Sequence, residues 1–416
     1  MGAIPCWKGA DMPNAERPDK HSRTGAPPRK RRWRVWAAVG IAMLAAACGG
    51  GAGETGQVTS ASTAALARQQ LPSWLKLPDI TTLRTRGNVG EKPTWYNQVT
   101  ISTKQVQQIR AKKLKAAFLN WSSGAYNQAV LAGAKDALAA MGIDLVAVTN
   151  YNFDEATLQT DVRNVMALDP DIIFYSGVDP VADAAALQPA VAAGVAVVSY
   201  ANAPKGWTTG KPDNFVSLVS YDTFGNGAAV ADAVAKRFPN GAKLGMIYYD
   251  RTYKLVNERE QGFLDEIRKT NVQVVTRQPM TDPAKTQPIA AAMLTRYPDL
   301  NVIFAPWDLP ADGVLAAVQS AQKDVAVAHI DLGFTGAKQI ACGGPIFVMS
   351  SQLVYEWGRT GAIAAALHEL GQKVPPYIVV PVFAVTKDNL EQGWNLAYGG
   401  QVPLPSGAQK CLKQAG

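Results

Sequence analysis

The residues best suited to ligand chemistry lie between positions 301 and 318. The apolar run Val302–Ala305 leads to Trp307 and Asp308, and a helical pattern begins at Pro310. A strand that runs directly into a helix places its last residues at the carboxyl edge of a parallel sheet, where ligands bind. An indole ring beside a carboxylate suits a ligand with one flat apolar side and one hydroxyl or amine. The simpler interpretation is an Asp N-cap beside a core Trp.

A second candidate pair is His329 and Asp331, which alternate along a predicted strand and therefore point to the same face. They could form a catalytic dyad, although a hydrogen-bond donor in a cleft or a core histidine is more common. Asp308 and Asp331 together would suit a glycosidase. A protein that binds hydroxyls also needs carboxylate acceptors, and nothing in the sequence marks either residue as an acid of raised pKa.

Other catalytic and cofactor patterns are incomplete. Gly225-Asn226-Gly227 lacks the third glycine of a dinucleotide fingerprint, so a tight turn before a helix explains it better. The chain has three histidines, and no two of them have the spacing of zinc ligands. No Gly-x-Ser-x-Gly nucleophile motif or phosphate loop is found. We expect no cofactor, no metal and no enzymatic activity.

The positive charge of the chain is concentrated at its beginning. The formal charge is +8, and residues 1–48 hold nine Lys and Arg against three Asp and Glu, which leaves 32 basic and 30 acidic residues for the remainder. A basic N-terminus on an almost neutral body argues against a nucleic-acid partner.

Residues 1–48 are typical of a secretory signal. A run of arginines precedes the apolar stretch Val35–Ala47, which is too short to span a bilayer. The small residues before Cys48 resemble a bacterial lipobox, in which the cysteine carries the lipid, although Ala45 stands where leucine is usual. An ordinary signal with an incidental cysteine is the alternative, and translation could start at Met12.

Two of the four cysteines remain after Cys6 and Cys48 are assigned to this segment. They are Cys342 and Cys411, and in an exported chain such a pair favours a disulfide that holds the C-terminal tail. Two separate buried thiols are the alternative.

The remaining chain alternates apolar runs with helical patterns. Residues 49–70 are Gly- and Ser-rich and favour a flexible tether. Residues 49–113 as a whole form a tether and extension of no assigned role, in which Ser102 and Gln105 fit a capping box. From Leu114 onward, strands rich in Val, Ile and Ala alternate with helices, which predicts parallel sheets covered on both faces. The predicted strands are 114–120, 144–149, 171–175, 196–200, 216–220, 243–249, 272–278, 301–305, 325–330, 345–350 and 377–385.

The alternation repeats at a larger scale. Asp169-Pro170-Asp171 and Tyr297-Pro298-Asp299 each follow a helix and lead into an apolar strand with a polar end. This duplication predicts two similar lobes whose carboxyl edges face each other across a cleft.

On these motifs, together with Gly133-Ala134-Lys135, Gln261-Gly262-Phe263 and Val385-Thr386-Lys387-Asp388, the chain from Leu114 to Trp394 resembles the type I periplasmic sugar-binding proteins of the ribose and galactose group. The resemblance implies an α/β fold of two doubly wound parallel-sheet lobes joined by a three-strand hinge. The chain would cross near 220–222, 351–352 and 382–385. The implied domains are residues 114–220 with 352–383, residues 221–351 with 384–400, and a tail at 401–416.

The resemblance also implies a ligand site. Asp308, Asp331 and Gln352 match the family's pattern, with Trp307 where asparagine is common, and Tyr126 and Asn127 fall on its aromatic pair. The family's Asp-Arg pair falls on Ala201 and Asn202, and a further arginine falls on Asn257. Without these charged groups the site would be a neutral pocket rich in rings. The full set of expected ligand contacts is Trp121, Tyr126, Asn127, Tyr175, Tyr200, Asn202, Asn257, Trp307, Asp308, Asp331 and Gln352.

By the same resemblance, the protein is an extracytoplasmic lipoprotein that binds a sugar or polyol-like ligand by hinge closure. It would deliver the ligand to an ABC permease, with the lipid on Cys48 holding it at the membrane, and we expect a monomer. Transcription regulators share the two-lobe body, but a helix-turn-helix precedes theirs. A ligand-sensing role, a small aromatic or neutral metabolite as ligand, and a glycoside-acting enzyme remain alternatives.

Overall fold

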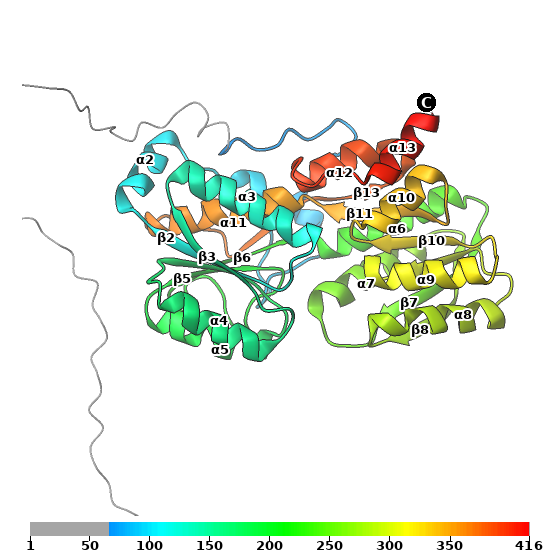
Figure 1. The fold of residues 1–416 in the computed structure, drawn as a ribbon, viewed down its shortest axis with the longest axis horizontal. Helices are drawn as coiled ribbons and strands as arrows, with labels where there is room; N and C mark the ends of the chain where they lie inside the picture. Colours follow the sequence, from blue (N-terminus) through cyan, green and yellow to red (C-terminus); the bar gives the residue numbers. More distant parts are fainter. Residues whose placement is uncertain (1–65, 416) are drawn as a thin grey trace, which may run out of the picture. The chain divides into compact units, whose positions relative to one another are not determined.

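The computed structural model describes residues 66–415 (Figure 1), all within one compact unit. The predictions for the signal segment, for Cys48 and for residues 49–65 of the tether therefore lie outside the described residues.

The first lobe is built on a seven-stranded sheet with the strand order β1-β12-β6-β5-β4-β2-β3. Its pairings are parallel. The strands are β1 (Thr94–Trp95), β12 (Tyr377–Val380), β6 (Phe215–Tyr221), β5 (Ala196–Tyr200), β4 (Ile172–Ser176), β2 (Lys115–Asn120) and β3 (Asp144–Asn150).

Helices cover both faces of this sheet (Figure 1). The first face carries α3 (Ala125–Met141) and α11 (Val354–Glu369), whose apolar side chains pack with Phe118 and Phe174. The second face carries α4 (Glu155–Met166) and α5 (Pro180–Ala192). Because successive strand residues point to opposite faces, burial on both sides explains the continuous apolar runs of the sequence.

The second lobe is built on a six-stranded sheet with the order β13-β11-β10-β9-β7-β8. β13 pairs antiparallel with β11, and the other pairings are parallel. The strands are β13 (Val382–Val385), β11 (Ile346–Gln352), β10 (Ala326–Ile330), β9 (Val302–Ala305), β7 (Ala242–Tyr249) and β8 (Val272–Met280). One face packs on α6 (Thr223–Arg237) and α7 (Lys254–Ile267), and the other packs on α8 (Thr286–Arg296), α9 (Asp308–Ser320) and α10 (Phe334–Cys342).

The chain passes between the sheets three times. β6 leads into α6 and β11 leads into α11, as predicted, and the third passage lies at Pro381 between β12 and β13. The single strand predicted at 377–385 is therefore two strands, and Val382 already belongs to the second sheet. Proline has no N–H to continue a ladder, which suits a change of sheet at this residue.

The extension before the first lobe is folded from Leu66 onward, and not merely a tether. We call residues 66–93 the N-terminal strap. Arg68 pairs with the buried Glu356 of α11 at 2.9 Å. Thr85 lies between the two lobes, with its hydroxyl 3.0 Å from that of Thr223 and 2.6 Å from that of Tyr377.

Further contacts hold the strap to both lobes. Arg84 forms an ion pair with Asp265 of α7 at 2.6 Å, and Asn88 donates a hydrogen bond of 2.6 Å to the Pro204 carbonyl of the first lobe. After the strap, α2 (Thr103–Lys112) begins at the predicted capping box of Ser102 and Gln105. The extension therefore braces the hinge region.

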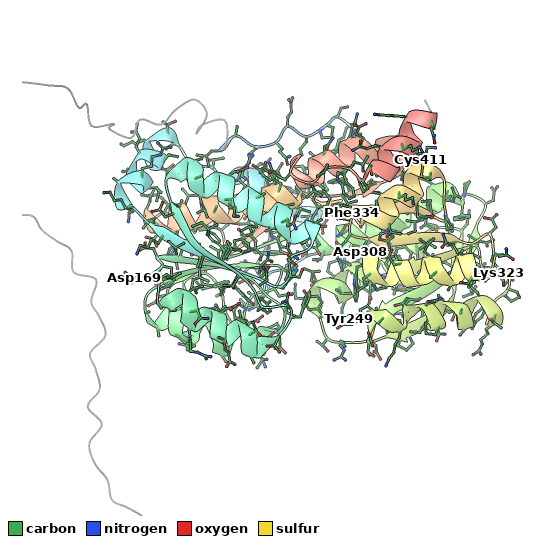
Figure 2. All side chains as sticks on the ribbon, in the orientation of Figure 1. Asp169, Tyr249, Asp308, Lys323, Phe334 and Cys411 are labelled. Atoms are coloured by element: carbon green, nitrogen blue, oxygen red, sulfur yellow. A yellow bond between two sulfur atoms is a disulfide. The ribbon has the colours of Figure 1, made fainter. Side chains whose placement is uncertain are left out.

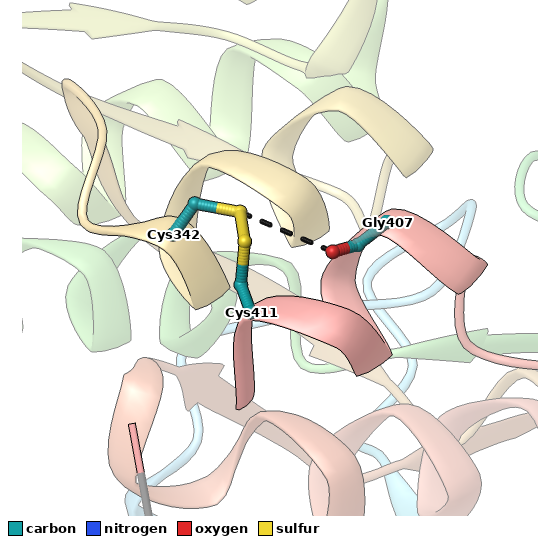
Figure 3. The surroundings of a disulfide bond; sticks show 3 residues. All are labelled: Cys342, Gly407 and Cys411. Atoms are coloured by element: carbon teal, nitrogen blue, oxygen red, sulfur yellow. Dashed lines mark hydrogen bonds between the residues drawn. A yellow bond between two sulfur atoms is a disulfide. The ribbon is translucent and has the colours of Figure 1, made fainter. Parts of the chain in front are cut away.

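The C-terminal tail is also structured. After α12 (Leu390–Tyr398), residues 401–416 contain α13 (Ser406–Ala415), a helix that the sequence analysis did not predict. The predicted disulfide joins Cys411 on α13 to Cys342 at the end of α10 (Figure 3). Short 3-10 turns complete the fold at η1 (Ile80–Thr82), η2 (Tyr96–Gln98), η3 (Pro283–Lys285) and η4 (Lys387–Asn389).

Candidate functional site

A hydrogen bond joins the carboxyl edges of the two sheets. Gln352, the last residue of β11, donates from Nε2 to the hydroxyl of Tyr126 at the start of α3, at 2.5 Å. Asp331 and Arg259 of the second lobe also lie close enough to Tyr126 for their charges to act on it. The residues at these edges are therefore neighbours, and a ligand site between the lobes stays a prediction.

The centre of the site is an ion pair. Arg259 on α7 donates from Nη1 to Oδ2 of Asp331 at 2.8 Å and to the hydroxyl of Tyr221 at 3.3 Å. Its other amino group lies 3.4 Å from the Pro306 carbonyl. Burial lowers the pKa of Arg259, but the charge of Asp331, the nearby Tyr221 and the hydrogen bond to Asp331 together outweigh it and hold the pKa above its usual value. Arg259 therefore stays charged beside Asp331.

Asp308 lies beside this pair, in the first turn of α9. It is not the helix cap, because that position belongs to Trp307 and no side-chain capping bond is made. Burial and the nearby charge of Asp331 raise the pKa of Asp308 to about 7. The sequence carried no sign of this shift. Figure 2 shows Asp308 and Tyr249 at the end of the second lobe nearest the first, far from Lys323.

Several buried polar atoms around the pair lack a partner within the described residues. They are Oδ1 of Asp331, Nε of Arg259 and Oδ1 of Asn226. The amide nitrogen of Asn226 lies 3.4 Å from Oε1 of Gln352, so Asn226 is hydrogen-bonded to the residue that contacts Tyr126. Leaving such atoms unpaired is unfavourable, and a hydroxylated ligand could satisfy them.

Rings form the first-lobe side of the site. Trp121 follows β2 and stacks on Tyr126, with centroids 6.3 Å apart and planes 13° apart. On the second lobe, Trp307 meets Tyr249 edge to face at 5.2 Å. Aromatic faces pack well against the apolar face of a small ring compound.

The fold described above agrees with the comparisons with known proteins. The sequence pattern of the periplasmic binding protein domain matches residues 116–373, more than half of the chain. The chain belongs to this family.

Among relatives, the ribose import binding protein of Escherichia coli is 25% identical over 72% of this chain and 99% of that protein. The ribose import binding protein of Bacillus subtilis is 29% identical over 47% of this chain, and the chain spans only 61% of that relative's length. A solute-binding protein of an ABC transporter from Agrobacterium vitis, bound with α-D-tagatopyranose, superposes with a TM-score of 0.61 at 23% identity, over 69% of this chain and 99% of that one. This structural likeness shows the fold.

In this periplasmic binding protein the charged group missing from our expectation is Arg259. The sequence analysis placed the family's arginine on Asn257, whose amide instead accepts a bond of 2.9 Å from the Tyr253 N–H at the start of α7. A signal was available, because Val256, Arg259 and Phe263 share the buried face of α7 at helical spacing. An arginine on such a face needs an acidic partner.

Three other expected contacts are buried within the first lobe. The hydroxyl of Tyr175 donates to Asp183, and that of Tyr200 donates to the Gly358 carbonyl at 2.9 Å. Both rings are fully buried in the core. Asn127 is 4% exposed and donates to Ser122 at 2.5 Å. We therefore move the two tyrosines from the ligand site to the core.

The remaining ionisable candidates lie outside the site. His329 is buried, its Nδ1 lies 3.0 Å from the Ile330 carbonyl, and burial lowers its pKa to about 4. A neutral core histidine of this kind is a poor partner for Asp331 in catalysis. Asn257 and Glu260 line a separate cavity of about 400 Å³ on the second lobe, and burial raises the pKa of Glu260 to about 7.

Residues 66–415 show neither a metal-binding cluster nor a membrane-spanning helix. These residues contain no group of three His, Cys, Asp or Glu side chains arranged to hold a metal ion. Over the same residues, no helix has the length and apolar character needed to cross a bilayer.

Proposed function

We propose that this protein captures a sugar or polyol-like ligand between its two lobes and delivers it to an ABC importer. The ion pair of buried Arg259 with half-buried Asp331, close to Tyr126 of the first lobe, is the observation that carries the proposal. The named relatives, which are ribose import binding proteins, support it. Membership of the periplasmic binding protein family supports a place outside the cytoplasm.

The chemistry of the site suits hydroxyl groups. Carboxylate oxygens of Asp331 and Asp308 accept hydrogen bonds from hydroxyls, and Arg259 donates to ligand oxygens. Gln352 can do both. Trp121, Tyr126 and Trp307 provide the ring faces that contact the carbon skeleton. Together these groups recognise a small molecule that is polar along its edge and apolar on its face.

Ligand would favour the closed arrangement because it bridges residues of both lobes. The second lobe adds the Arg259 and Asp331 contacts, which an open arrangement cannot bring to a ligand held on the first lobe. The permease would then recognise the closed shape.

Binding without chemical conversion is part of the proposal. The raised pKa of Asp308 would by itself suit a general acid. However, Asp331 is already engaged by Arg259, which makes it a poor nucleophile or base. We infer that the ionised form of Asp308 binds the ligand by accepting a hydrogen bond from a hydroxyl.

We further propose that residues 1–48 are a signal, that lipid on Cys48 anchors the protein to the cell membrane, and that it acts as a monomer. Replacement of Cys48 by serine should release the protein from the membrane fraction. Retention of the Cys48→Ser protein in membranes would contradict the anchor alone.

The function is tested by titrating the purified full chain with pentoses, hexoses and polyols in a calorimeter. We expect saturable binding of at least one compound to a single site, with the compound recovered unchanged. Deletion of the gene should abolish uptake of that compound by cells. Failure of every compound to bind, or the appearance of a hydrolysis product, would contradict the proposal.

A further inference from the structure

The aromatic side of the site continues outward beyond the residues considered so far. Phe153, in the loop between β3 and α4, stacks on Trp121 with centroids 6.3 Å apart and planes 15° apart. Trp121 in turn stacks on Tyr126, which accepts the hydrogen bond from Gln352. Three near-parallel rings therefore lead from the polar centre of the site to the surface of the first lobe.

Phe153 occupies an unfavourable position. Its φ is +60°, in the left-handed region, and the preceding Asn152 has a φ of +51°. Few side chains other than Gly, Asn and Asp adopt this region without strain. Its ring is nevertheless 59% exposed. Backbone strain of this kind clusters at ligand contacts. A large exposed ring at a strained position beside Trp121 therefore favours a contact with ligand.

The second lobe also has an exposed apolar side chain next to a polar residue of the site. Leu309 follows Asp308 in the first turn of α9 and is 57% exposed.

Charge is distributed unequally across the site. The charged groups that act on Tyr126 are Asp331 and Arg259, and both belong to the second lobe. The first lobe presents Trp121, Tyr126 and Phe153 on the opposite side. A sugar with hydroxyls around its whole ring would leave two of these rings without apolar surface to contact. A ligand with one apolar and one polar side would match both the aromatic first lobe and the charged second lobe.

We propose that the ligand is a hydroxylated molecule that carries a flat apolar substituent. The substituent lies on the exposed ring of Phe153, at the outer end of the stack, and the hydroxyls face Arg259, Asp308 and Asp331. This inference rests on the proposed function and specifies the ligand class of the same site. Phe153 is thereby assigned as a residue that determines specificity.

The test uses matched glycosides. The purified full chain is titrated with the free sugar, the methyl glycoside and the phenyl glycoside of each pentose and hexose in the panel. Because stacking of one aromatic pair contributes modestly, we expect the phenyl glycoside of the preferred sugar to bind about tenfold more tightly than its methyl glycoside.

Variants then assign the gain to the stacked rings. Phe153→Ala should remove most of the tenfold preference and leave affinity for the methyl glycoside unchanged, while Phe153→Tyr should keep the preference. Phe238→Ala is the control, because Phe238 is a half-buried ring at the C-terminal end of α6, away from the carboxyl edge of the sheet, and meets Phe347 edge to face. It should keep the preference. Thermal melting of each variant reports whether it is folded.

Each other outcome overturns the inference. Equal affinity for phenyl and methyl glycosides, with free sugar still bound, rejects the apolar subsite and leaves the proposed function intact. If Phe153→Ala loses the same affinity for the phenyl and the methyl glycoside, Phe153 has a structural role only. Loss of uptake without any change in binding assigns Phe153 to the permease contact. Failure of all three compound types to bind rejects the proposed function and the subsite together.

Discussion

The two lobes share one architecture and present different chemistry at the edges that face each other. Each is a mainly parallel sheet covered by helices, and in each the residues that follow the strands form the site. The first lobe presents the rings of Trp121 and Tyr126. The second presents the ionisable side chains of Arg259, Asp308 and Asp331. A similar backbone therefore does not impose a similar surface, because the residues after a strand do not have to fill the core.

This difference suggests a division of labour in binding. Ring stacking depends little on exact orientation, whereas charge-assisted hydrogen bonds are short and directional. The first lobe would hold the ligand's face, and the second would select its hydroxyl pattern during closure. Three experiments test this difference between the lobes. They are given in order of decreasing expected effect on affinity.

The largest effect is expected from Asp331→Asn. The change removes the charge that Arg259 pairs with and weakens a charge-assisted contact to the ligand, so affinity should fall by about 2 kcal/mol, or roughly thirtyfold. Calorimetric titration measures this loss. Because Arg259 would remain buried and charged, the melting temperature should fall as well.

Asp169→Asn is the control for that change. Asp169 is exposed, lies at the outer end of the first lobe (Figure 2) and has a φ of +54°, which asparagine also tolerates. Affinity should not change. If Asp331→Asn behaves like this control, the second lobe does not supply the directional contacts.

A smaller effect is expected from pH through Asp308. Because its pKa is raised to about 7, the folded state keeps a proton that the unfolded chain releases above its ordinary pKa. The stability from this group is therefore greatest at low pH and decreases as pH rises through about 4 to 7. Because the ionised carboxylate accepts hydrogen bonds from hydroxyls, affinity should fall by up to about tenfold between pH 8 and pH 6.

Titrations between pH 6 and 8, roughly one unit either side of the pKa, measure this dependence. Asp308→Asn should flatten it. The control is Asp232→Asn, since burial also raises the pKa of Asp232 but its charged neighbours are Glu266, Lys236 and Lys269 rather than site residues. A pH profile unchanged in Asp308→Asn and flattened in Asp232→Asn would move the sensitivity away from the ligand site.

The smallest effect on affinity is expected from the disulfide. Replacing Cys342 and Cys411 together by serine opens a link across a separation of 69 residues. The free energy of unfolding should fall by about 2–4 kcal/mol. α10 begins near Asp331 and ends at Cys342, so the link lies about 13 Å from the site along that helix. Affinity should therefore change less than roughly twofold.

Hydrogen exchange distinguishes the lobes in that experiment. Amides of α10 and α13 should lose protection, and those of α3 and α4 should keep it. A loss of protection spread equally over both lobes would show that the tail stabilises the whole molecule.

Most of the framework could be predicted from the sequence. The apolar runs marked nearly every strand, the duplication indicated two lobes, and the capping box of Ser102 and Gln105 located a helix start. The contacts of the N-terminal strap could not be predicted, because they are ion pairs and hydrogen bonds to residues far along the chain. Arg68, for example, pairs with Glu356, and no local pattern predicts such a partner.

The positions of the predicted site residues follow from local patterns. Asp331 follows β10, Asp308 begins α9, Gln352 ends β11 and Tyr126 lies in the first turn of α3. Their role in binding stays a prediction. Tyr175 and Tyr200 were placed by the same logic, but they are strand residues whose rings are buried in the core. A strand residue near the carboxyl edge can point into the core or toward the site, and the local sequence does not distinguish the two.

Periodicity and capping are local properties of the chain, so they specify most of the strands and helices. Which polar groups meet depends on how those elements pack. Asn257 and Arg259 are two positions apart on α7, a rotation of about 200° around the helix. Only the packing of α7 against the second sheet turns Arg259 toward Asp331 and leaves Asn257 to hold its own helix start.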